Sequence, residues 1–168
     1  MSSFTTPFAP PKGLPEIIST FGDISIFIKS DGTLSQPEMN NLLTTMELPY
    51  PMIYAYDSTI TIKHITCHKK IAPIFMEVFN QIKEKGFEKY AQEYGGCYVF
   101  RPKRLSQKLS CHSWGIAIDI NPRTNKQGTP GNMNKNIVTI FESLGFTWGG
   151  RWKGTLQDSM HFQYATHY

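Results

Sequence analysis

The sequence predicts one domain of the α+β class. Its 168 residues have the length of a single domain, and 40% apolar with 13% aromatic residues is enough to form a hydrophobic core. Alternating segments typical of strands lie between segments with helical periodicity. No internal repeat, linker or low-complexity stretch marks a second domain, so we expect residues 1–168 to fold as one unit.

The N-terminal part is expected to begin with an arm. Residues 1–13 are rich in proline and end in glycine, which predicts an extended segment lying over the domain. A capping-box pattern at residues 35–38, followed by apolar residues at helical spacing, predicts a helix over about 38–46 that Pro49 and Pro51 end. The other elements expected here are a helical turn and two strands, over residues 14–18, 24–28 and 58–65.

The strongest helical pattern lies over residues 69–85. Six apolar side chains repeat there at three and four residues, the spacing of one buried face: Ile71, Ile74, Phe75, Val78, Phe79 and Ile82. This segment is predicted to be the central core helix. After it we expect a short helix over 88–94 that Gly95 and Gly96 end and a helix from the cap Asn134 through Leu144. Strand-like segments are expected over residues 97–101, 115–121, 146–152 and 160–164, with a polar loop over 102–108.

Charge and cysteine content exclude some classes of function. A net charge of +4 and a pI near 8.9 are too modest to indicate a nucleic-acid partner, although they fit an anionic target. Cys67, Cys97 and Cys111 are an odd number without a CxxC pair, which predicts reduced thiols. No secretory signal peptide or membrane-spanning run is recognisable, so we expect synthesis in the cytoplasm and export by another route.

Two stretches together predict a metal site. His112 and Asp119 lie seven residues apart where a loop leads into an alternating segment, and near the C-terminus Asp158 precedes His161 by three residues. In a strand, Asp119 lies on the face opposite three isoleucines, so its carboxylate can face a cleft. Catalytic zinc usually has three protein ligands and an open position, which His112, Asp119 and His161 would satisfy for one ion.

Two further residues are candidates for catalysis. Asp158 is a carboxylate placed just before a ligand strand, where it can act as general base and then as general acid. Arg101 is the cation expected to bind a substrate carboxylate or carbonyl, because a guanidinium can do so with two hydrogen bonds.

Each candidate also has a structural interpretation. His112 or His161 taken singly fits a hydrogen-bonded histidine in a turn or core, and His64 and His68 are better explained by structural or surface roles than by a second metal site. Cys111 beside His112 is not expected to act as a nucleophile. Core packing explains the three tryptophans, Trp114, Trp148 and Trp152, as well as a substrate groove does.

The compound motif resembles a known family. Ser-x-His-x-x-Gly-x-Ala-x-Asp, formed by Ser110, His112, Gly115, Ala117 and Asp119, with the later Asp158-x-x-His161, is similar to the D-alanyl-D-alanine carboxypeptidase and L-alanyl-D-glutamate endopeptidase family. These are zinc peptidases of bacterial walls and phage endolysins that share a fold with the hedgehog signalling domain. The resemblance covers about residues 60–164 and implies a small antiparallel sheet that carries the zinc site and packs against several helices.

The resemblance also implies roles for the candidates. His112, Asp119 and His161 would be the zinc ligands and Asp158 the catalytic base, while Arg104 competes with Arg101 for the family arginine. Bacterial peptidoglycan stem peptides would be the substrate, cleaved at the L-Ala-D-Glu bond by an endolysin-like endopeptidase or, as the alternative, at D-Ala-D-Ala by a carboxypeptidase. A non-catalytic zinc module of hedgehog type is a further alternative. We expect a monomer that reaches the wall after lysis or through a secretion system.

Overall fold

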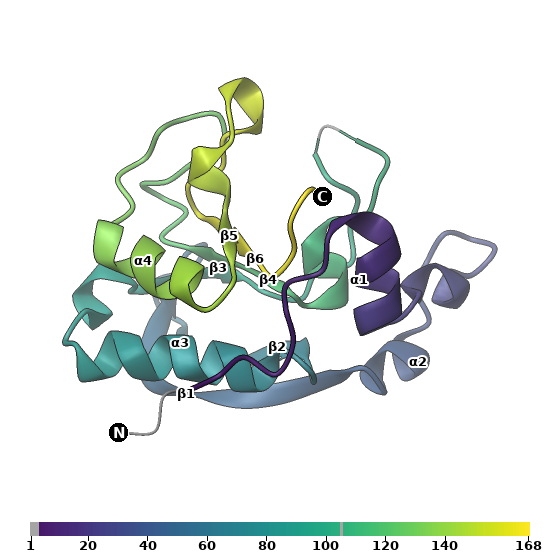
Figure 1. The fold of residues 1–168 in the computed structure, drawn as a ribbon, viewed down its shortest axis with the longest axis horizontal. Coiled ribbons are helices and arrows are strands. Elements are labelled where there is room, and N and C mark those ends of the chain that lie inside the picture. The colour runs from purple at the N-terminus through teal and green to yellow at the C-terminus, as the bar shows by residue number, and fades with distance from the viewer. Residues whose placement is uncertain (1–3, 105) are drawn as a thin grey trace.

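A six-stranded sheet lies at the centre of the computed structural model, which describes residues 4–104 and 106–168 (Figure 1). The spatial order of its strands is β2-β1-β3-β4-β6-β5. Only β1 and β3 pair in parallel among these neighbours, whereas the other pairs are antiparallel. The strands are β1 (Leu43–Tyr54), β2 (Thr61–His68), β3 (Glu93–Gly96), β4 (Ala117–Ile120), β5 (Thr147–Trp148) and β6 (His161–Gln163). The predicted α+β class, with a largely antiparallel sheet against helices, is confirmed.

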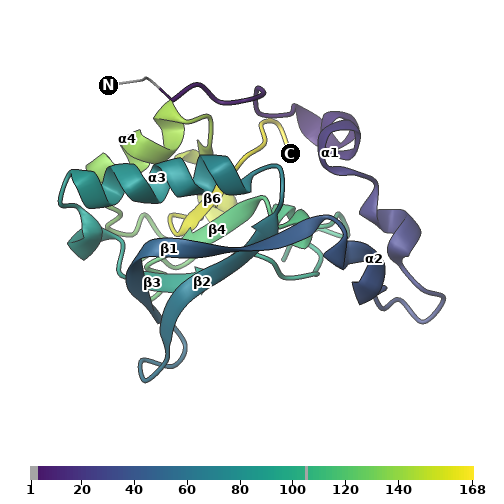
Figure 2. The same ribbon diagram turned by 90° about the horizontal axis from the view of Figure 1, so that it is seen from below.

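Two helices cover one side of this sheet, and the core lies between them and the strands (Figure 2). The predicted central helix is α3 (Ala72–Glu84), which buries five of the apolar residues of its expected face. Beside it lies α4 (Lys135–Ser143), whose cap is Asn134 as predicted, because the Asn134 side chain accepts a hydrogen bond from Asn136 N. The remaining helices are α1 (Gly13–Phe21) and α2 (Gln36–Asn40).

The N-terminal arm is extended and docked on the domain over its described part, residues 4–12, while residues 1–3 of the expected arm lie outside the described residues. The Phe8 ring packs edge-on against Phe21 and Tyr164, and the Tyr164 hydroxyl donates a hydrogen bond to Phe8 O at 2.5 Å. Thr166 then pairs with the end of the arm, since its amide donates to Pro11 O and its carbonyl accepts from Gly13 N. The arm is therefore held against the C-terminal segment.

Two predictions for the N-terminal part were wrong. Residues 24–27 form a short 3₁₀ helix instead of a strand, because Asp23 caps the turn by accepting a hydrogen bond from Ser25 N. The helix expected over 38–46 ends at Asn40, and β1 begins at Leu43.

Pro49 and Pro51 lie inside β1 and do not end a helix before it. They fall where the pairing of β1 with β2 is interrupted, between Glu47 and Met52, so their missing amide protons are not needed there. Pairing with β2 over residues 43–47 therefore decides the structure of a segment whose apolar spacing also fits a helix.

The strand expected over 97–101 was misplaced by a few residues. The strand is β3, which includes Gly95 and Gly96, and the short helix before it shrinks to a 3₁₀ turn over Glu88–Tyr90. Residues 97–101 lead into the loop expected over 102–108, of which residue 105 lies outside the described residues.

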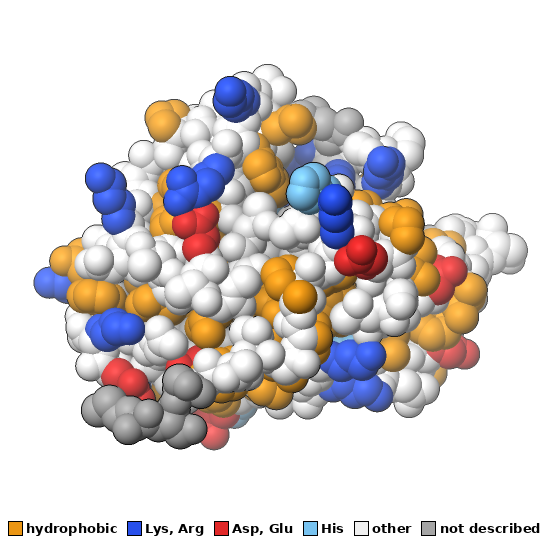
Figure 3. All heavy atoms as spheres, in the orientation of Figure 1, with side chains coloured by type: hydrophobic (Ala, Val, Ile, Leu, Met, Phe, Trp, Pro, Cys, Tyr) orange, Lys and Arg blue, Asp and Glu red, His pale blue; other side chains and the backbone are white. Residues whose placement is uncertain are grey.

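Lysine and arginine side chains are spread over the face shown in Figure 3 and do not gather into one basic patch among its described residues. No helix in the described part of the chain combines the length and the apolar character needed to cross a bilayer.

His68 ends β2 as a buried, neutral histidine. Its Nε2 lies 3.0 Å from Phe21 O, and its Nδ1 accepts a hydrogen bond from Lys70 N, so both ring nitrogens have partners. Burial lowers the pKa of His68 to about 4 from the ordinary 6.5.

We expect the free energy of unfolding to fall as the pH falls from 6.5 to 4, because the unfolded chain binds a proton at His68 over this window and the folded chain does not. The loss from this residue should reach roughly 3 kcal/mol, at about 1.4 kcal/mol for each pH unit. Urea unfolding of the metal-free protein and of His68→Gln at several pH values checks this. A difference between the two proteins that stays constant with pH would contradict it.

Candidate metal centre

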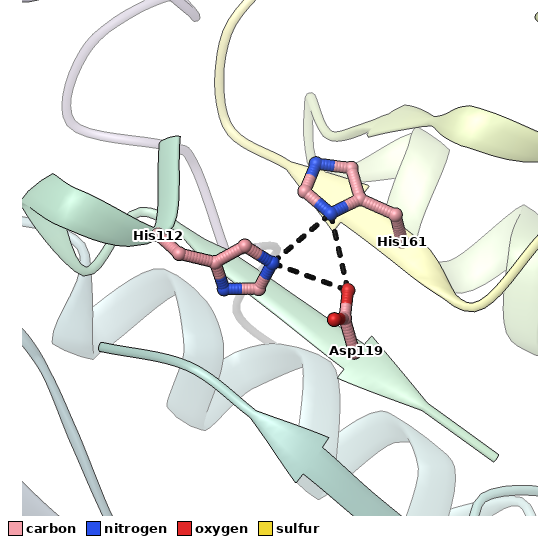
Figure 4. A group of neighbouring side chains, drawn as sticks. All are labelled: His112, Asp119 and His161. Carbon is pink, nitrogen blue, oxygen red and sulfur yellow. Dashed lines mark hydrogen bonds and ion pairs between the residues drawn. The ribbon is translucent and has the colours of Figure 1, made fainter. Parts of the chain in front are cut away.

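Three buried side chains converge at one point, as Figure 4 shows. His112 Nε2 lies 3.2 Å from Asp119 Oδ1 and 3.1 Å from His161 Nδ1, and His161 Nδ1 lies 3.1 Å from Asp119 Oδ1. Each residue contributes one atom that can bind a metal, and these three atoms all lie within 4.8 Å of one another. The structure thus brings together the three residues that the sequence predicted as ligands.

The sheet explains why residues far apart in sequence meet. Asp119 on β4 is the direct cross-strand partner of His161 on β6, so their side chains leave the sheet side by side on the same face. His112 comes from the 3₁₀ helix Cys111–Trp114 that precedes β4, and Ser110 caps that helix by accepting a hydrogen bond from His112 N. The turn before the strand therefore supplies the third side chain.

Glycines make room around these ligands. Gly115 ends the 3₁₀ helix with a φ of 68°, and a Cβ there would lie 2.9 Å from His68 N, against the end of β2. A Cβ at Gly95 on β3 would lie 2.9 Å from Asp119 Cβ. Gly115 thus permits a left-handed turn packed on β2, and Gly95, expected to end a helix, lets β3 approach β4 closely.

The hydrogen bonds around the cluster fix where the protons are. His112 Nδ1 lies 2.8 Å from Cys97 O, and a carbonyl only accepts, so Nδ1 carries the proton and Nε2 keeps a lone pair. His161 Nε2 lies 3.0 Å from Gln163 Oε1, which leaves the lone pair on Nδ1. With neutral rings, two nitrogen lone pairs and a carboxylate oxygen face one another without a proton between them. A bound cation would resolve this, and the set of two imidazoles and one carboxylate fits zinc.

The contacts within the cluster also shift the pKa values of Asp119 and His161. Burial would raise the pKa of Asp119, but the charge of His112 and hydrogen bonds with both histidines outweigh it and hold the pKa well below its ordinary value. Burial would lower the pKa of His161, but Asp119 raises it. A proton or a metal ion can therefore satisfy the cluster, and metal binding must displace the proton.

Asp158 reaches the same region through a tight turn. Its carbonyl accepts a hydrogen bond from His161 N at 3.1 Å, so the spacing Asp-x-x-His corresponds to a turn that leads directly into β6. Burial raises the pKa of Asp158 to about 6, and the Asp119 charge adds to this against the opposing effect of His161. Its Oδ1 is buried without a hydrogen-bond partner in the described residues, so it lacks the donor that a buried carboxylate oxygen normally has.

Two cavities flank the cluster of His112, Asp119 and His161. One of about 420 Å³ is lined by His161, Asp158 and Trp152, and the other of about 220 Å³ by His112, Asp119, Gly95 and Gly96 with the pair Tyr54 and Tyr56. No residue of the arm lines either cavity over its described part.

Arg101 and Arg104 line both cavities, so the structure does not separate these two candidates. The Arg101 guanidinium donates a hydrogen bond to Pro102 O, and that of Arg104 donates one to Gln127 Oε1. In the described part of the chain neither arginine pairs with a carboxylate, so both guanidinium groups keep donors for a substrate.

The other sequence candidates have structural roles. Trp114 is buried and donates a hydrogen bond to Gly22 O, and Trp148 donates one to Ser159 O. Of the three tryptophans, Trp152 is the one that lines either of the two cavities described above. Burial raises the pKa of the Cys111 thiol to about 12, which leaves almost no thiolate for a nucleophile. His64 is exposed and belongs to no ligand cluster found among the described residues.

Sequence reasoning assigned no role to residues that line a cavity beside the cluster or contact a ligand candidate from outside it. Tyr54 and Tyr56 carry no motif, and their place beside the site follows only from the parallel pairing of β1 with β3. Gln163 gave a usable signal, because it lies two residues after His161 and therefore on the same face of the strand.

Comparison with known proteins supports the peptidase resemblance over part of the chain. The model of a family described as D-alanyl-D-alanine carboxypeptidase matches residues 104–164, which is less than half of the sequence. The match contains His112, Asp119, Asp158 and His161, and it begins just after Arg101. No curated protein and no solved structure was found to match. Over this segment the chain is similar to a family of peptidases, with a cluster that can hold a metal ion.

We expect the zinc-free protein to take up one zinc ion and to gain stability, because three lone pairs then acquire a shared cation. The gain should be about 4 kcal/mol when free zinc is roughly 1,000 times its Kd. Thermal unfolding in a zinc titration measures this, with Asp119→Ala expected to lose the gain. The matched control is His64→Ala, which removes an exposed histidine. An equal loss in both variants would rule out this cluster as the binding site.

Gly115→Ala is expected to destabilise the protein more than Gly128→Ala does. Both glycines have positive φ, 68° and 79°, which costs about 1–2 kcal/mol for a residue with a side chain. A Cβ at Gly128 meets nothing within 4 Å, whereas one at Gly115 meets the backbone of β2. Chemical denaturation should show the additional loss, together with weaker zinc binding through the displaced His112. Equal destabilisation would show that the contact with β2 is unimportant.

Proposed function

We propose that this protein is a zinc-dependent peptidase that hydrolyses stem-peptide bonds of bacterial peptidoglycan. One observation carries the proposal. His161, one of the three converging ligand candidates, lines the same cavity as Asp158, a carboxylate whose buried Oδ1 has no partner among the described residues. A ligand set with an adjacent, unsatisfied acid is what metal-assisted hydrolysis requires.

Asp158 would move the proton in this reaction. A zinc ion bound by the cluster would supply a Lewis acid able to lower the pKa of water from about 15.7 to about 7. Because its own pKa is raised to about 6, Asp158 can accept a proton from the attacking water near neutral pH and return it to the departing amine. The buried position that raises its pKa also keeps it beside His161.

The charge of the larger cavity supports an anionic substrate. Its described lining includes one carboxylate, Asp158, and four cationic side chains: Arg101, Lys103, Arg104 and Lys108. Lys103 is placed over the Tyr168 ring, 3.6 Å from its centre. Stem peptides carry free carboxylates, and a cavity with this excess of positive charge would attract them.

The second cavity favours an endopeptidase over a carboxypeptidase. Because one cavity lies on the His161 side of the cluster and the other on the His112 side, a peptide can extend in both directions from the scissile bond. We therefore propose the L-Ala-D-Glu bond, as in endolysins. Cleavage of terminal D-alanine remains the second candidate, which the description of the matching family favours. The hedgehog-type alternative is less well supported, since a module without activity does not need Asp158.

The protein would act outside the compartment in which it is made. We propose synthesis in the cytoplasm and access to the wall after lysis or through a secretion system, with the monomer as the active form.

Zinc-loaded protein incubated with purified muropeptides is expected to release D-Glu-initiated peptides, which mass spectrometry identifies. Release of terminal alanine alone would instead establish the carboxypeptidase. Asp158→Asn should lower kcat/KM by about 10²–10⁴-fold, the usual contribution of a general acid or base, while one zinc ion stays bound.

The control for this variant is Asp31→Asn, which removes an exposed carboxylate of a turn. It should hydrolyse muropeptides like the wild type. Full activity of Asp158→Asn would exclude Asp158 as the catalytic base, and zinc-loaded wild type without activity on any muropeptide would overturn the proposed function.

A further inference from the structure

Gln163 contacts the ring nitrogen of His161 that faces away from the other two ligand candidates. It follows His161 on β6, it is 3% exposed, and its Oε1 lies 3.0 Å from His161 Nε2. The imidazole is thus between two groups, with Nδ1 toward His112 and Asp119 and Nε2 toward Gln163.

The orientation of the Gln163 amide is fixed from its other side. Its Nε2 lies 3.2 Å from Ala165 O and 3.4 Å from Tyr168 O, and both of these oxygens can only accept hydrogen bonds. If the amide were reversed, Oε1 would face two acceptors in a buried place without a donor, which is unfavourable. The segment 165–168 therefore keeps the amide oxygen directed at His161.

That segment is itself anchored. The Tyr168 hydroxyl donates to Leu109 O at 2.7 Å, and Thr147 Oγ1 donates to Ala165 O at 2.8 Å from the adjacent strand β5. The two oxygens that orient Gln163 are thus held in place by groups outside the cluster.

The consequence concerns the proton of His161. Because Oε1 accepts, the proton must sit on Nε2, and Nδ1 must carry the lone pair that faces the other ligands. With a reversed amide, His161 Nε2 would become the acceptor and the proton would move to Nδ1, into the space that a metal needs.

We propose that Gln163 is a positioning residue that holds His161 in its metal-binding tautomer, oriented in turn by the main-chain oxygens of Ala165 and Tyr168. The proposal depends on the metal site and not on the substrate or on peptide hydrolysis. The proposal also implies that residues 165–168, which contribute no ligand, affect metal affinity through their contacts with Gln163.

The first test measures zinc affinity by competition with a chromophoric chelator. Gln163→Leu should bind zinc about 10–100-fold more weakly than the wild type, the usual effect of removing a hydrogen bond to a ligating histidine. Gln163→Glu keeps an acceptor for His161 Nε2 but turns a second oxygen toward Ala165 O and Tyr168 O, so it should be less stable than the wild type and still bind zinc more tightly than Gln163→Leu. Equal zinc affinity of Gln163→Leu and the wild type would overturn the proposal.

The matched control is Gln81→Leu, the same substitution at a half-buried glutamine of α3 whose amide donates to Glu77 Oε1. It should bind zinc within about threefold of the wild type, in contrast to the 10–100-fold loss expected when a partner of a ligating histidine is removed. If Gln81→Leu weakens zinc binding as much as Gln163→Leu does, the effect is a general loss of stability and the positioning role is wrong.

The second test needs no substitution and remains valid if a variant fails to fold. Nitrogen-15 NMR of the zinc-free wild type at alkaline pH reports the tautomer of each imidazole. His161 is expected to carry its proton on Nε2 and His112 on Nδ1. A His161 proton on Nδ1 would overturn the proposal, whatever the protein does with peptidoglycan.

Discussion

The direct pairing of Asp119 with His161 across β4 and β6 is the constraint on which the rest of the site depends. It joins two short strands and presents a carboxylate and an imidazole on one face, at a spacing that the backbone sets. His112 can complete the group only because the turn before β4 closes at Gly115 and packs on β2. A change of register by one residue would turn one of the two paired side chains to the opposite face of the sheet and separate the ligands.

The convergence of His112, Asp119 and His161 could be predicted from the sequence because the residues are local in two stretches. Ser110 to Asp119 contains a cap, a left-handed turn and the start of a strand, and Asp158 to His161 is one tight turn. In both stretches short-range geometry determines where the side chains lie. The amphipathic helix α3 was predictable for a similar reason, since its periodicity has only one interpretation.

The errors occurred where pairing over a longer range decides the structure. The spacing of Leu42, Leu43 and Met46 fits a helix, but residues 43–47 pair with β2 and form a strand. Gly95 and Gly96 have the composition of a helix stop, yet they are in β3, which pairs with β4, and Asp119 of β4 lies too close to Gly95 for a side chain there. The contribution of Tyr54 and Tyr56 to a cavity depends on the parallel pairing of β1 and β3, for which the sequence holds no local signal.

The three cysteines have a consequence for the surroundings in which the fold persists. Cys67, Cys97 and Cys111 are free and at most 1% exposed, and burial raises the pKa of each thiol. Disulfide exchange and oxidation need an accessible thiolate, so these side chains react only when the core opens. The native protein therefore tolerates an oxidising medium without forming disulfides, and its chemical lifetime there is set by how often the core unfolds.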